Sequence, residues 1–304
     1  MAERDRGLTV LDAPSNLGLR PPDDGLVPGC YKAPGVLRDA GLLPRLSASD
    51  AGVVTPGRYR PDWAPGRVRN EAAIADHSRQ LAGRVQALLD RPRLPVVLGG
   101  DCSILVGIAL ALRGGGRYGL VSLDGLDYRH PGNMDDAGVA VGGESLALVT
   151  GLGGSLADLD GRRPYLQAAD IVAVGLRPDD ECAAEAAVNG LNLIDALAVS
   201  RDPAAAAAEA LSVVERPELD GFWIHVDADV LDPTVMPAVD SHEPGGLSFD
   251  QLTTVLHRLL ASPRAVGLDL TIYDPDLDPG LRAGQQLADV LVDAFGAAPE
   301  TGRG

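Results

Sequence analysis

Acidic side chains gather in the motif Asp227-Ala-Asp229-Val-Leu-Asp232-Pro233, which follows the apolar run 221–226. Such a run predicts a buried β-strand, and side chains two residues apart on a strand share a face, so Asp227 and Asp229 are expected to converge. Two carboxylates held close together raise each other's pKa, and a divalent cation relieves their repulsion. The alternative is that one acid caps the next turn while the other faces water.

Two more apolar runs end in polar residues. Cys102 follows Val97-Leu-Gly-Gly-Asp101, and Asp124 and Asp127 follow the run that ends at Leu123. Because ligands bind beyond the carboxyl ends of strands in a parallel sheet, we expect these three side chains to lie beside Asp227 and Asp229. The sequence therefore predicts a divalent metal site with Cys102, Asp124, Asp127, Asp227 and Asp229 as its ligands.

The elements that must position these residues alternate along the chain, as short apolar runs followed by helical patterns. This pattern predicts an α/β fold with three layers, α/β/α, and a doubly wound, mostly parallel sheet. The predicted strands are 7–11, 95–98, 118–123, 170–176, 191–194, 221–226 and 265–270, and the predicted helices are 70–89, 103–112, 179–188, 203–214, 249–261 and 282–295. We expect a single domain over 1–304 with disordered tails at 1–6 and 299–304, and a surface loop at 14–34.

Composition limits the function. A net charge of −17 and a pI near 4.6 argue against nucleic acid and anionic membrane surfaces as partners. Cys30, Cys102 and Cys182 are widely spaced, which argues against a disulfide framework and favours a cytoplasmic protein. No run is long enough to span a bilayer. Lys32 is the only lysine, a bias typical of a GC-rich genome and compatible with bacterial specialised metabolism.

Taken together, the motifs resemble those of the arginase and agmatinase (ureohydrolase) family. That family carries Gly-Gly-Asp-His-Ser, Asp-Ala-His-x-Asp and Asp-x-Asp-x-x-Asp-Pro on successive strands, and the stretches 34–43, 243–248 and 266–270 match it as well. The resemblance implies an arginase-like fold, two manganese ions, hydrolysis of a non-peptide C–N bond in a small molecule, and a homo-oligomer, either a trimer or a hexamer.

The departures from the family pattern fall on its metal ligands. Cys102 replaces a histidine, and the second motif is one residue shorter and has no histidine. Asp124 and Asp127 then face opposite ways unless the chain turns at Gly125, which a glycine permits. A Cys102 thiolate would favour Zn²⁺ or Fe²⁺, whereas a protonated thiol would only pack. A carboxylate-rich site suits Mn²⁺, the expected ion, and one ion rather than two stays an open alternative.

The resemblance also bears on the substrate. Gly142 stands where the family has a pocket histidine, and Ile272 stands near its guanidinium-binding glutamate, which argues against arginine as substrate. Arg129 stands at a substrate-contacting asparagine and could clamp a carboxylate, or it is simply solvated. Ser241 falls at a substrate-binding position.

Polar residues in the two loops complete the candidates. His130 could replace a lost imidazole as acid, base or ligand, His242 could contact the substrate, and Glu243 could act in catalysis, although each also fits an ordinary surface or structural role. We expect His225, inside an apolar strand, to be a core histidine with satisfied hydrogen bonds.

Three functions remain open on these grounds. The first is a divergent metal-dependent hydrolase of an amidino, ureido or amide compound. The second is a metal-poor pseudoenzyme that serves as a scaffold or binding subunit. The third uses Cys102 as a nucleophile with His130 or His242 as its base, which requires hydrogen-bond contact between them.

Overall fold

The computed structural model describes residues 7–64, 67–134 and 139–296. Its centre is one sheet of eight strands in the order β2-β1-β3-β8-β7-β4-β5-β6, with every neighbouring pair parallel. The strands are β1 (Gly7–Ala13), β2 (Ser49–Val53), β3 (Arg93–Gly99), β4 (Tyr118–Leu123), β5 (Ile171–Leu176), β6 (Asn192–Asp195), β7 (Gly221–Asp227) and β8 (Ala265–Thr271).

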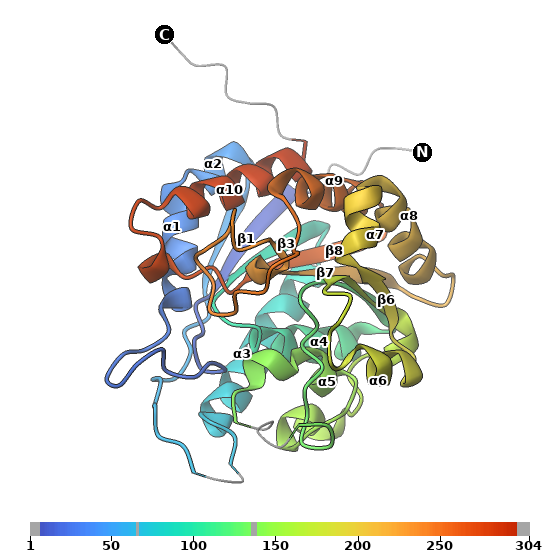
Figure 1. Cartoon of the computed structure of the whole chain (residues 1–304). Helices are drawn as coiled ribbons and strands as arrows, with labels where there is room; N and C mark the ends of the chain where they lie inside the picture. Colours follow the sequence, from blue (N-terminus) through green and yellow to red (C-terminus); the bar gives the residue numbers. More distant parts are fainter. Residues whose placement is uncertain (1–6, 65–66, 135–138, 297–304) are drawn as a thin grey trace.

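Helices cover both faces of the sheet (Figure 1), so the expected three-layer α/β/α fold is confirmed. One face carries α3 (Glu71–Leu89), α4 (Ile104–Gly115), α5 (Ser145–Val149) and α6 (Ala183–Val188). The other carries α1 (Ala33–Asp39), α2 (Leu42–Arg45), α7 (Ala196–Arg201), α8 (Pro203–Val214), α9 (Phe249–Leu260) and α10 (Arg282–Ala294). Short 3-10 helices are η1 (Gly29–Lys32), η2 (Val141–Glu144), η3 (Ser155–Gly161), η4 (Ala168–Asp170), η5 (Ala228–Val230) and η6 (Pro275–Leu277).

Two hydrophobic cores lie between these layers, and each central strand contributes to both. In β7, Phe222 and Ile224 pack into the core under α8 and α9, while Trp223 packs into the core under α3 and α4. All three side chains are fully buried. A strand buried on both faces needs apolar residues throughout, which is why the runs in the sequence are continuous rather than alternating.

The structure departs from the sequence expectations in several respects. The edge strand β2 was not predicted, because its mostly exposed residues form no apolar run. Helix α6 begins at Ala183, four residues later than predicted. The predicted surface loop 14–34 is partly buried, since residues 15–19 and 28–30 are buried, and it ends in η1 (Gly29–Lys32) and the start of α1. The predicted tails 1–6 and 299–304 lie outside the described residues, and no described helix has the length and apolarity to cross a membrane.

Strand order determines which loops meet. The last two strands, β7 and β8, occupy the centre of the sheet between β3 and β4. The carboxyl ends of β3, β8, β7 and β4 are therefore neighbours, although β3 and β8 lie far apart in the sequence. Crevices at such a change in strand order are where α/β sheets bind ligands.

Candidate metal centre

Three aspartates converge at this edge of the sheet. Asp124 directly follows β4, Asp227 ends β7, and Asp229 lies in η5. One carboxylate oxygen from each lies within 4.8 Å of the others, and we refer to these three residues as the aspartate group. Asp227 also accepts a hydrogen bond from the Asp229 backbone N–H at 2.8 Å, which begins η5 and holds Asp229 against the strand end. All three line a cavity of about 460 Å³.

Asp127 reaches the same cavity through a turn after β4. The turn that the sequence predicted at Gly125 is made with positive φ at Leu126 (φ 115°) instead. The Asp127 carboxylate accepts a hydrogen bond from the Ser145 hydroxyl at 3.1 Å. Among the described residues, Asp127 is not one of those whose ligand atoms lie within 4.8 Å of one another. It therefore stands beside the aspartate group rather than within it.

The electrostatics of these acids favour a cation. Burial is the largest cause that raises the pKa of each of the four aspartates above its usual value. Neighbouring carboxylate charges raise the pKa of Asp127, Asp227 and Asp229 further. Asp124 Oδ2 and Asp229 Oδ1 are buried and accept no hydrogen bond. Buried, unpartnered carboxylate oxygens are ligands that suit a hard divalent cation, so the residues present fit one.

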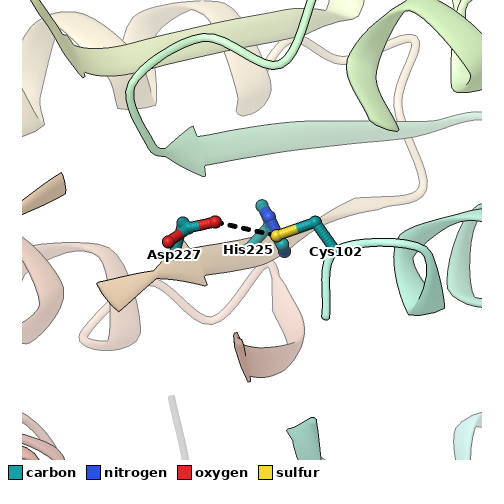
Figure 2. A group of neighbouring side chains, drawn as sticks. All are labelled: Cys102, His225 and Asp227. Carbon is teal, nitrogen blue, oxygen red and sulfur yellow. Dashed lines mark hydrogen bonds between the residues drawn. The ribbon is translucent and has the colours of Figure 1, made fainter. Parts of the chain in front are cut away.

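Cys102 lies beside Asp227, in the turn between β3 and α4 (Figure 2). Its side chain is completely buried, and its thiol donates to Asp227 Oδ2 at 2.8 Å. Burial, followed by the charge of Asp227, raises the pKa of the Cys102 thiol well above its usual value. A thiol buried in this way is not activated as a nucleophile unless a cation or base takes its proton.

His225 lies on β7 two residues before Asp227 and therefore on the same face of the strand. Its Nδ1 lies 2.6 Å from Asp269 Oδ2 of the neighbouring β8, whereas its Nε2 is buried with no hydrogen-bond partner. The expectation of a satisfied core histidine was thus right for one ring nitrogen only. Ligand atoms of Cys102, His225 and Asp227 lie within 4.8 Å of one another. We refer to these three residues as the Cys–His–Asp group.

The remaining histidine candidates are engaged elsewhere. His130 Nε2 lies 3.0 Å from Glu185 Oε1, and its Nδ1 accepts from the Gly132 N–H at 3.0 Å. His242 Nε2 lies 2.8 Å from the Pro237 carbonyl oxygen. Neither histidine is among the residues that line the cavity. The fold therefore does not place His130 or His242 as a base for Cys102.

Two of the three predicted substrate residues, Arg129 and Ser241, line the cavity, whereas His242 does not. Glu243, a predicted catalytic residue, lines it as well, together with Gly142 and Ile272. Ile272 is 4% exposed and places an apolar side chain on this wall.

Arg177 is a site residue that the sequence analysis missed. It follows β5 directly and donates hydrogen bonds to the carbonyl oxygens of Asp229 at 3.0 Å and Glu243 at 2.7 Å. It therefore joins the turn at Asp229 to the loop that carries Glu243. The available signal was its position, because it is the first polar residue after an apolar run.

Comparison with known proteins places this geometry in a family. The model described as the arginase family matches residues 25–296. The chain belongs to the arginase family. The arginase of Bacillus caldovelox is 25% identical to it over 278 residues, which is 88% of this chain and 93% of that protein. Human arginase-1 is 27% identical over 302 residues, which is 91% of this chain and 88% of that protein.

Solved structures agree with this assignment. The Bacillus caldovelox arginase structure matches this member of the arginase family with a TM-score of 0.86 at 24% identity, covering 96% of this chain and 99% of that one. The formimidoylglutamase of Bacillus subtilis matches with a TM-score of 0.75 at 23% identity, covering 96% and 87%. Both matches show that the fold extends over nearly the whole of this chain.

Proposed function

We propose that this member of the arginase family is a metal-dependent hydrolase of a non-peptide C–N bond in a small molecule. The observation that carries the proposal is the aspartate group, which lines a cavity of about 460 Å³ with two buried carboxylate oxygens that accept no hydrogen bond. Cavities of about 300–1,000 Å³ are typical of small-molecule sites. Mn²⁺ is among the cations that hard oxygen donors suit, and it is the ion that the family resemblance implies.

A divalent cation held here supplies Lewis-acid chemistry, because it lowers the pKa of water and polarises a planar carbon attached to nitrogen. The residues of the chain do the rest. Asp124, Asp227 and Asp229 hold the cation, and Asp127 lies beside them with a pKa well above its usual value because of its burial. Asp127 takes the proton of the attacking water and passes it to the leaving nitrogen as the C–N bond breaks.

The cavity wall supports a substrate other than arginine. A guanidinium group bound against Ile272 would meet an apolar side chain there and gain no ionic partner from it. Arg129 and Ser241 offer a guanidinium and a hydroxyl on the same wall, and together they suit a carboxylate on the far part of the substrate. We therefore propose an amidino, ureido or amide compound that carries a carboxylate. The name of the formimidoylglutamase relative indicates that the fold is used on substrates other than arginine.

The test combines metal content with turnover. Metal-free protein supplemented with Mn²⁺ is expected to take up cation and to release ammonia, urea or an amine from one class in a panel of guanidino, ureido, formimidoyl and amide carboxylates. Asp124→Asn is expected to abolish both, because it removes one ligand from the aspartate group. Asp220→Asn, on a loop remote from the cavity, is the matched control. Full metal uptake without turnover on any class would contradict the proposal. No uptake at all would also contradict it and would favour the metal-poor pseudoenzyme.

A further inference from the structure

We propose that the Cys–His–Asp group is a second cation site, softer than the aspartate group, and that it selects Zn²⁺ or Co²⁺ over Mn²⁺. The inference extends the proposed function, because the two sites share Asp227. Its donors would be Cys102 Sγ, His225 Nε2 and an oxygen of Asp227.

The orientation of His225 is the main support. Asp269 lies opposite His225 in the register between β7 and β8, and both side chains are fully buried. Trp223 Nε1 donates to the other oxygen of Asp269 at 2.6 Å, so the carboxylate is fixed as an acceptor. In the neutral imidazole with Nδ1 donating to Asp269, the lone pair of His225 is on Nε2, where a cation would replace a proton. A histidine held by a carboxylate in this way is the usual arrangement for a metal-binding imidazole.

The hydrogen bonding around His225 Nε2 distinguishes a cation site from a closed hydrogen-bond network. Cys102 is satisfied without a cation, since its thiol donates to Asp227 and lies 3.1 Å from Thr271 Oγ1. His225 is not, because Nε2 is buried beside these groups and has no hydrogen-bond partner. A buried nitrogen in a folded protein almost always has a partner, and a cation between Nε2, the sulfur and the carboxylate would provide one.

The donor types set the selectivity. Sulfur and imidazole favour Zn²⁺, Co²⁺ and Fe²⁺ over Mn²⁺. Cysteine, histidine and carboxylate are all zinc ligands, and catalytic zinc sites use three protein ligands. The aspartate group presents oxygen alone and favours the harder ion. Two neighbouring cation sites, one with softer donors than the other, would explain why Cys102 and His225 lie next to Asp227.

Cobalt absorption tests the proposal without any activity assay. The metal-free full-length protein is titrated with Co²⁺, and we expect two ions per chain together with a thiolate-to-cobalt charge-transfer band in the near ultraviolet. Cys102→Ser is expected to remove the band and one of the two ions. Cys30→Ser is the matched control, because Cys30 is also buried but takes no part in either group. The wild-type spectrum is decisive even where the Cys102 variant does not fold.

The second measurement uses variants of His225 and of Asp269, the residue that holds it. His225→Gln is expected to lower the stoichiometry to one ion, and Asp269→Asn is expected to weaken Co²⁺ binding at the softer site by about 10- to 100-fold while leaving the band detectable. In competition, Zn²⁺ should displace the thiolate-bound Co²⁺ and Mn²⁺ should not. Uptake of Co²⁺ without the band would overturn this inference and leave the proposed function standing. Absence of any Co²⁺ or Mn²⁺ uptake would overturn both.

Discussion

Asp227 is shared by both groups of ligands, so replacing it tests the electrostatics of the site most sharply. In the metal-free protein, burial and the nearby aspartates raise its pKa. A carboxyl whose pKa is higher in the folded state stabilises the fold below its unfolded pKa, and that contribution is lost as the pH rises through the folded value. The same sign applies to Asp124, Asp127 and Asp229. Metal-free protein is therefore expected to become less stable as the pH rises above about 4.

The size of the effect follows from linkage. The free energy of unfolding falls by about 1.4 kcal/mol per pH unit for each proton that the folded state retains and the unfolded state has lost. Asp227→Asn removes one such carboxyl and costs at most one hydrogen bond, worth about 0.5–1.5 kcal/mol. We therefore expect a shallower pH dependence and a variant that is more stable than wild type at the alkaline end.

Denaturant unfolding in a chelating buffer from about pH 5 to about pH 9 measures this slope. Asp232→Asn is the control, because it lies in the same motif but hydrogen bonds lower the pKa of Asp232 to about 2. The stability that Asp232 contributes is lost only as the pH falls toward that value, so the control should keep the wild-type slope. Identical slopes for wild type and Asp227→Asn would refute the reasoning.

Cation addition should reverse the trend in wild type only. A cation present at a hundredfold its Kd stabilises the fold by about 2.7 kcal/mol. For 304 residues with an unfolding entropy of about 2.1 cal/mol/K per residue, this corresponds to a rise in Tm of about 4 °C. The rise should grow with pH, because the ligands must be deprotonated. A comparable rise in Asp227→Asn would show that the cation binds elsewhere.

Three further predictions concern the cavity wall and the sheet. Ile272→Glu should tighten arginine binding to metal-loaded protein by roughly 10- to 150-fold, the worth of a charged hydrogen bond of about 1.5–3 kcal/mol, and calorimetry that shows no tightening would contradict it. Arg129→Ala should raise KM for a carboxylate-bearing substrate about 10- to 100-fold with little change in kcat, and a loss confined to kcat would be contrary. Gly267→Ala should lower the free energy of unfolding by about 1–3 kcal/mol, because its Cβ would lie 2.0 Å from the Trp223 ring. Gly83→Ala, which has open space around its Cβ, should instead stabilise α3 by up to about 1 kcal/mol. Equal effects of the two variants in denaturant unfolding would contradict this prediction.

Most of the fold could be predicted because the sheet is buried on both faces. Every strand except β2 coincides with an apolar run, and β2 (Ser49–Val53) is an edge strand that buries too little to leave a pattern. Short helices such as α5 (Ser145–Val149) and α7 (Ala196–Arg201) are too brief for helical periodicity to show. Their positions depend on tertiary packing rather than on local sequence.

The part of the site that could be predicted consists of residues that lie at or directly after the ends of predicted strands. Asp124, Asp227 and Asp229 follow apolar runs, and strand-end geometry brought them together correctly. His225 was different, because the sequence shows that it shares a face with Asp227 but not that Asp269 stands beside it. That contact depends on β8 pairing with β7, and strand order is a property of the whole sheet. The turn at Leu126, which carries Asp127 to the cavity, likewise depends on contacts such as the Ser145 hydrogen bond.

Anomalous diffraction from crystals soaked in Mn²⁺ shows whether the aspartate group binds a cation. We expect an anomalous peak bounded by carboxylate oxygens of Asp124, Asp227 and Asp229, the three acids that converge at the carboxyl edge of the sheet. A map at saturating Mn²⁺ that shows ordered water and no anomalous signal among these three carboxylates would contradict it.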